Sequence, residues 1–124
     1  MLTHVQIVHV PVLDQDRAKA FYVDRLGLVV VADMEMGPHG RWLQVAPEGA
    51  STSLALVPRD GTAQSGVATV VFESTDVEAD AETLRTKGVD LPKPIEQMPW
   101  ATALRFEDPD GNHIALQSST VAKQ

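Results

Sequence analysis

Three side chains in strand-forming segments are of types that could carry chemistry: His9, Glu73 and His113. Imidazole and carboxylate groups are proper ligands for Fe, Mn, Ni or Zn. The same groups can also act as general base and general acid without a metal. In a third interpretation the histidines line a polar pocket and hydrogen-bond a ligand, and in a fourth they have no functional role. The residue types alone leave these alternatives open.

Three more residues could contact a small organic molecule. Trp100 follows a proline before an expected strand, where its indole could stack on a planar or cationic ligand, or simply pack against the sheet. Arg105 lies on the strand that follows and would hold an anionic group if it points inward, which strand parity alone does not decide. Gln117 is four residues beyond His113 and therefore shares its face of the last expected strand.

The composition narrows the class of function. The chain has 124 residues, no cysteine and a formal net charge of −7. The lack of cysteine excludes disulfides, thiol nucleophiles and iron–sulfur clusters, and the acidic balance argues against a nucleic-acid partner. No apolar run approaches the roughly 20 residues that span a bilayer, and the N-terminus has no signal pattern. We expect a cytoplasmic protein with no membrane partner, whose acidic surface suits a cationic ligand.

Two predicted helices, which begin and end with the same residue types, would hold these side chains in place. Asp14 and Asp76 are each suited to cap the N-terminus of a helix. Each helix is followed by a glycine, Gly27 or Gly88, which can adopt the left-handed conformation at a helix end. The two aspartates are 62 positions apart, half of the 124-residue chain. This spacing predicts an internal duplication.

Each repeat is expected to contain one strand, one helix and three further strands, a βαβββ plan. The fold class is therefore α+β, with two tandem modules in a single domain of residues 1–124 and a curled mixed sheet around a cleft. The modules span residues 3–58 and 66–118, with strands expected at residues 3–12, 28–35, 41–46 and 52–58 and at 67–74, 89–95, 102–107 and 112–117.

Both ends of the chain carry the motifs of a known family. The segment Val8–Asp14 runs from a strand into a capped helix whose register is marked by Arg17, Phe21 and Tyr22. The segment Asp108–Ile114 forms a tight turn that opens the last strand. Together they resemble the vicinal oxygen chelate superfamily, which includes glyoxalase I, bleomycin-resistance proteins and extradiol dioxygenases. The resemblance covers nearly the whole chain and implies the tandem βαβββ fold and a homodimer.

In metal-dependent members of that superfamily, four strand positions supply the metal ligands. Their offsets from the helix caps and from the final turn place them in this chain at Ile7, Ala55, Thr69 and Ala115. Three apolar side chains and one hydroxyl do not make an ordinary metal site. The resemblance therefore implies no cofactor at these positions, and a divalent metal could bind only at a displaced site made by the two histidines and the glutamate named above.

The favoured function is the binding of a small organic molecule in the cleft without a metal, as in the bleomycin-resistance branch. The alternative is a lyase, isomerase or dioxygenase that uses the displaced site, and a module acting only through its interfaces is a third option. The sequence leaves open whether the cleft lies within one chain or across a dimer. The candidate ligand-binding residues are His9, Glu73, Trp100, Arg105, His113 and Gln117.

Overall fold

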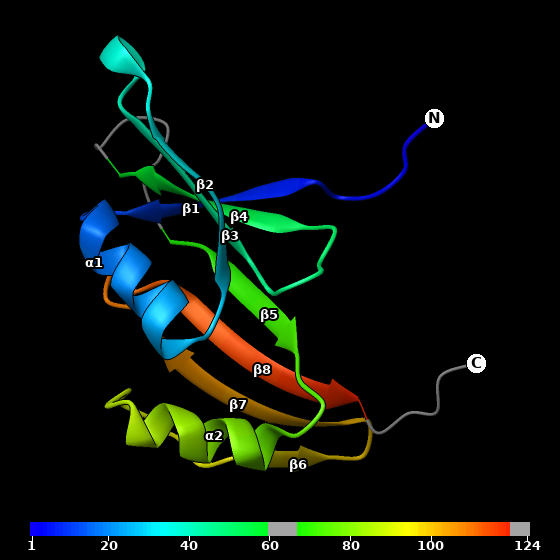
Figure 1. Cartoon of the computed structure of the whole chain (residues 1–124). Helices are drawn as coiled ribbons and strands as arrows, with labels where there is room; N and C mark the ends of the chain where they lie inside the picture. The colour runs from blue at the N-terminus through cyan, green and yellow to red at the C-terminus, as the bar shows by residue number, and fades with distance from the viewer. Residues whose placement is uncertain (60–66, 120–124) are drawn as a thin grey trace. The chain divides into compact units, whose positions relative to one another are not determined.

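A computed structural model describes residues 1–59 and 67–119 of the chain. The chain divides into two compact units, Met1–Ala68 and Thr69–Gln124. Each unit contains a four-stranded mixed sheet and an α-helix (Figure 1). The expected α+β class and tandem βαβββ plan are confirmed, and residue 66, the expected start of the second module, lies outside the described residues.

The first unit contains a sheet in the strand order β1-β4-β3-β2, in which β1 and β4 are parallel and the other neighbours antiparallel. The β2–β3 hairpin is the long arm that carries a short 3-10 turn at its tip (Figure 1). The elements of the first unit, in chain order, are β1 (Ile7–Val12), α1 (Gln15–Lys19), η1 (Ala20–Arg25), β2 (Val29–Glu35), η2 (Gly37–His39), β3 (Arg41–Ala46) and β4 (Ser53–Pro58).

The apolar core of the first unit follows from strand alternation. Val10 pairs with Leu56 across β1 and β4, so both side chains lie on one face of the sheet, and both are fully buried. The helical segment contributes Phe21 and Tyr22, which are also buried and meet edge to face with ring centroids 5.3 Å apart. Strand β1 begins only at Ile7, four residues later than expected.

The first helix begins as predicted and then changes geometry. The Asp14 carboxylate accepts a hydrogen bond from the backbone N–H of Arg17 at 3.0 Å, which confirms the cap. From Ala20 to Arg25 the helix has π geometry, in which the Leu26 N–H donates to the Phe21 carbonyl five residues earlier. The wider turn accommodates two consecutive buried aromatic rings, and the sequence pattern predicted only a uniform α-helix.

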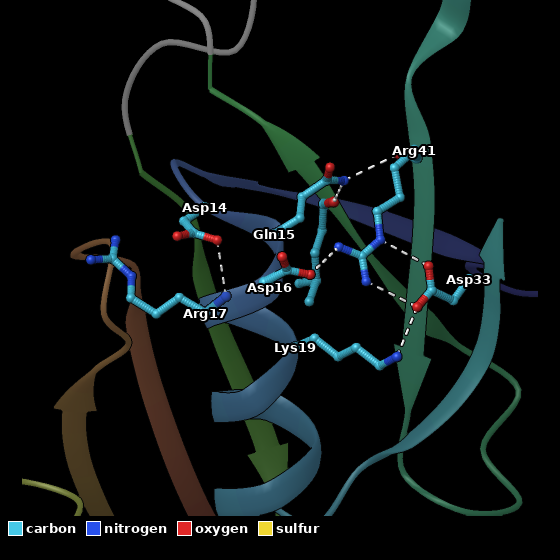
Figure 2. A network of polar contacts seen from close by, with 8 residues as sticks. Asp14, Gln15, Asp16, Arg17, Lys19, Asp33 and Arg41 are labelled. Carbon is cyan, nitrogen blue, oxygen red and sulfur yellow. Dashed lines mark hydrogen bonds and ion pairs between the residues drawn. The ribbon is translucent and has the colours of Figure 1, made fainter. Parts of the chain in front are cut away.

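A polar network joins α1 to three strands of its sheet (Figure 2). Arg41 on β3 donates to Asp16 on α1 at 2.6 Å and to Asp33 on β2 at 2.8 Å, while Lys19 donates to Asp33 at 2.8 Å. The Gln15 amide donates to the carbonyls of Arg41 and Leu56. The network thus joins α1 to β2, β3 and β4.

The second unit has a sheet in the order β5-β8-β7-β6, again with one parallel pair, β5 with β8. Helix α2 packs against β7 and β8 and buries Val77, Ala81 and Leu84. The side chain of its cap, Asp76, accepts from the Ala79 N–H at 3.0 Å. The elements are β5 (Thr69–Glu73), α2 (Val77–Thr86), β6 (Glu96–Met98), β7 (Ala101–Glu107) and β8 (His113–Ser119).

One expected strand of the second unit is wrong. Residues 89–95 form no strand, and the edge strand is instead β6, only three residues long. Pro92 and Pro94 lack the N–H group that a strand interior needs for pairing, so this segment crosses to the edge as a loop. No helix within the described part of the chain is long and apolar enough to cross a membrane.

Candidate functional site

The open face of the second sheet, which is the face that α2 does not cover, carries polar side chains in successive rows across the strands. The strand register places His113 of β8 between Thr69 of β5 and Glu107 of β7. In the next row Ala115 lies between Val71 and Arg105. Because residues directly opposite each other point to the same side of a sheet, these side chains share the face that α2 does not cover.

This face forms part of a pocket of about 820 Å³. Three of the residues predicted from the sequence line it, namely Arg105, His113 and Gln117. Its volume falls in the range of about 300 to 1,000 Å³ that is typical of small-molecule sites. The apolar part of the lining includes Val71 and Ala115.

A hydrogen-bonded turn precedes His113 at the start of β8. The buried Asp108 carboxylate accepts hydrogen bonds from the backbone N–H groups of Asp110 and Asn112 and from the Asn112 side-chain amide, each at 2.8 Å. Gly111 takes a positive φ of 84° at the corner. The turn predicted from the sequence is therefore present, and its own side chains hold it together.

Arg105 points to the open face, and its guanidinium is paired. Its Nη1 atom forms an ion pair with Oε1 of Glu96 on the neighbouring strand β6. Roughly half of each side chain remains accessible to solvent, 45% for Arg105 and 47% for Glu96. The sequence left the direction of Arg105 open, and the register decides it because Arg105 is the cross-strand partner of Ala115.

His9 lies in the first unit, where it meets an aromatic neighbour. Its ring stands edge-on to Trp42, with centroids 6.0 Å apart and planes at 70°. The Trp42 indole N–H donates to the Gln44 side-chain oxygen at 2.9 Å. His9 pairs with Ala55, which in turn pairs with Gln44, so these side chains share one face of the first sheet. They form a polar and aromatic cluster.

Two further predicted residues, Glu73 and Trp100, are like His9 not part of the pocket lining. Glu73 shares the open face but pairs with Gln117, four residues along β8 from His113 and hence about 13 Å away along the strand. Trp100 lies in the turn between β6 and β7 and is 56% exposed. Glu73 is therefore at the opposite end of its sheet from His113.

The family's metal-ligand positions do not fit a metal ion. Ile7 and Ala55 share a face of the first sheet, and Thr69 and Ala115 share the open face of the second. Among these side chains only the Thr69 hydroxyl has a donor atom. Across residues 1–59 and 67–119, no group of three histidine or carboxylate side chains is arranged to hold a metal ion.

Several lining residues were missed by the sequence reasoning. Asp90, Pro92 and Lys93 contribute to the pocket from the loop that had been expected to be a strand. Glu107 also lines the pocket, and its signal was present, because it lies two residues beyond Arg105 and so on the same face of β7. The ion pair of Glu96 with Arg105 could not be predicted from nearby residues, because the register of β6 with β7 brings the two side chains together.

Several proteins are similar to this chain in sequence, in structure or in both. TnmS3, an antibiotic-binding protein from Streptomyces sp. CB03234, is 44% identical with a TM-score of 0.86, covering 96% of this chain and 98% of that one. A superfamily member from Sphaerobacter thermophilus DSM 20745 is 33% identical with a TM-score of 0.84, covering 94% and 98%. The protein YetH of Bacillus subtilis (strain 168) is 38% identical over 120 residues, covering 94% of this chain and 99% of YetH.

A family model matches almost the entire chain. It spans residues 2–116 and describes the Glyoxalase/Bleomycin resistance protein/Dioxygenase superfamily. The superfamily is the one that the helix caps and the final turn indicated. The chain belongs to the Glyoxalase/Bleomycin resistance protein/Dioxygenase superfamily.

Proposed function

We propose that this protein binds a small organic molecule in the pocket of its second unit, without a metal at the family's ligand positions. The observation that carries the proposal is the pocket itself, which brings Arg105, His113 and Gln117 together beside an apolar wall. The 44% identity to an antibiotic-binding protein over nearly the full length of both chains supports the same class of ligand.

The lining offers both apolar contact and directional hydrogen bonds. Val71 and Ala115 present aliphatic surface to the pocket. The Gln117 amide can donate and accept, and a neutral His113 ring can do the same through its two nitrogens. Such a combination of a few polar groups with an apolar wall fixes the orientation of a ligand and supplies its binding energy.

The residues at the family's metal positions support binding rather than metal-assisted catalysis. Ile7, Ala55 and Ala115 replace side chains that would hold the ion, so no step of the superfamily's metal chemistry can be assigned to them. The displaced arrangement of His9, Glu73 and His113 is not favoured, because Glu73 and His113 lie at opposite ends of the second sheet.

Ligand screening by thermal shift tests the proposal. A library of antibiotics and of aromatic, cationic and neutral organic molecules is added to the purified protein, and hits are measured by calorimetry. A specific ligand raises the melting temperature because it binds the folded state only. Failure of every compound to shift the transition would contradict the proposal.

A blocking substitution locates the binding site. Val71 lines the pocket and is 58% exposed, so Val71→Trp fills the pocket without disturbing the core. Val5→Trp is the matched control, since Val5 is 62% exposed in the first unit and precedes its first strand. We expect Val71→Trp to weaken binding at least about tenfold, equivalent to about 1.4 kcal/mol, and Val5→Trp to leave it unchanged. Equal binding by the two variants would place the ligand elsewhere.

We also infer that the protein is a homodimer, as the family resemblance implies. Edge strand β2 exposes several apolar side chains, including Val30, Val31 and Met34. Exposed apolar edge strands of this kind are commonly covered by a partner. Light scattering at micromolar concentration should give twice the chain mass of 13.4 kDa, and a monomer mass would contradict the inference.

A further inference from the structure

The hairpin of β6 and β7 places a carboxylate next to the cationic wall of the pocket. Glu96 pairs with Ala103 in the strand register, and Arg105 lies two residues further along β7 on the same face. The two side chains form an ion pair through Nη1 and Oε1. Arg105 lines the pocket whereas Glu96 does not, so a residue outside the lining controls a charge inside it.

The remaining charges of the lining are acidic on balance. Asp108 already accepts three hydrogen bonds within its turn. Asp90, Lys93 and Glu107 also line the pocket, and none of them has an ion pair with any described residue. With Arg105 neutralised by its partner, the lining contains three carboxylates, at Asp90, Glu107 and Asp108, and one ammonium group, at Lys93.

We propose that the Glu96–Arg105 ion pair sets the charge preference of the pocket, so that it accepts an organic cation and rejects an organic anion. The proposal rests on the proposed binding function. Glu107 supplies the counter-charge, because its carboxylate lies beside His113 on the open face and forms no ion pair with the described residues. Glu96 is a specificity-determining residue that acts through Arg105.

The preference for a cation comes from the carboxylates of Glu96 and Glu107, which surround a bound ligand. An exposed ion pair is itself worth little, about 0 to 1 kcal/mol. An anion could therefore displace Glu96 from Arg105, but it would then lie between the released Glu96 and Glu107. Such repulsion of the wrong ligand is a common source of specificity. A cation meets Glu107 without breaking any contact.

Three probes of the same shape and different charge test this inference. Naphthylmethylamine is a cation at neutral pH, naphthylmethanol is neutral and naphthoate is an anion. Their affinities are measured by calorimetry at low ionic strength, where charge effects are largest. The wild-type protein should bind the amine about threefold to fivefold more tightly than the alcohol, the range expected for one exposed charge contact, and should bind the anion most weakly.

Substitutions distinguish the ion pair from a general effect of net charge. Glu96→Gln should abolish the preference for the amine and strengthen the binding of naphthoate. Glu73→Gln removes the same charge from the same face, but Glu73 has no ion pair with any described residue and does not line the pocket, so it should leave the ratio unchanged. The double variant Glu96→Gln/Arg105→Met has a neutral pair of side chains again and should regain the preference for the amine.

Each outcome decides the inference separately from the binding function. If the alcohol binds but the amine has no advantage, the charge proposal is overturned and the binding function stands. It is also overturned if Glu73→Gln acts like Glu96→Gln, or if the double variant does not regain the preference. If none of the three probes binds, the charge proposal is overturned, because the pocket does not accept an organic cation of this kind, and the library screen alone decides the binding function.

Discussion

Arg41 on β3 and Asp33 on β2 are joined by two hydrogen bonds, from Nε to Oδ1 at 2.8 Å and from Nη2 to Oδ2 at 3.0 Å (Figure 2). Asp33 also accepts from Lys19 on α1. One carboxylate of an outer strand therefore binds two cations, one of which comes from the helix. Together they hold the helix against the β2–β3 hairpin.

Asp33→Asn should lower the stability of the protein modestly, because the two ion pairs are lost while the shape of the side chain is kept. The pairs are partly exposed and screened by salt, so we expect a fall of only a few degrees in melting temperature. Asp24→Asn is the matched control, since Asp24 is an exposed aspartate with no ion pair among the described residues. Equal effects of the two substitutions would show that the network contributes nothing.

The same network predicts a pH dependence. Hydrogen bonds from Arg41 and then Lys19 hold the pKa of the Asp33 carboxyl well below its usual range. A lowered pKa in the folded state stabilises the protein above the ordinary aspartate pKa of about 3.9, and this stability is lost as the pH falls toward the lowered value. Urea midpoints of wild type and Asp33→Asn should thus differ at neutral pH and converge below about pH 3.9. A constant difference down to the most acidic pH would contradict this.

The Asp108 turn should be the most sensitive local motif of the second unit. Asp108→Ala removes three hydrogen bonds and leaves the donors of Asp110 and Asn112 without their acceptor. We expect a loss of about 2 to 4 kcal/mol in the free energy of unfolding, measured with urea. Asp108→Asn keeps an acceptor oxygen and should lose less, so a larger loss for asparagine than for alanine would contradict the account.

The two helix caps should contribute equally to the free energy of unfolding. Asp14 and Asp76 each accept one backbone hydrogen bond at 3.0 Å from the residue three positions later. Replacement of either by alanine should cost about 1 kcal/mol, and replacement by serine should restore most of it. Denaturant unfolding with all four variants tests this. A serine variant no more stable than its alanine counterpart would exclude a capping role.

Divalent metals should not stabilise the protein. Three of the four family ligand positions are aliphatic, at Ile7, Ala55 and Ala115. A thermal shift series with Ni, Zn, Mn, Fe and Co should therefore give no change. Elemental analysis of protein purified without chelators complements it. Stoichiometric metal that is lost in His9→Ala or His113→Ala would instead support the displaced site.

The sequence by itself determined the features that depend on neighbouring residues. A helix-capping aspartate accepts a hydrogen bond from a backbone N–H only three residues later, and a glycine at a helix end takes a positive φ, so both features depend on local sequence. Asp14, Asp76, Gly27 and Gly88 all behave as predicted. Strand alternation likewise predicted that His113 and Gln117 share a face. These signals are strong enough to identify the duplication and the superfamily.

Only the tertiary structure decided which distant residues meet. The pairing of Glu96 with Arg105 depends on the register of β6 with β7, and the contribution of Pro92 and Lys93 to the pocket depends on the path of their loop beside the sheet. The π geometry after Lys19 likewise accompanies the burial of two adjacent rings against the sheet. Local hydrogen bonding is encoded within a few residues, whereas the choice of partners across a sheet is settled by packing of the whole unit.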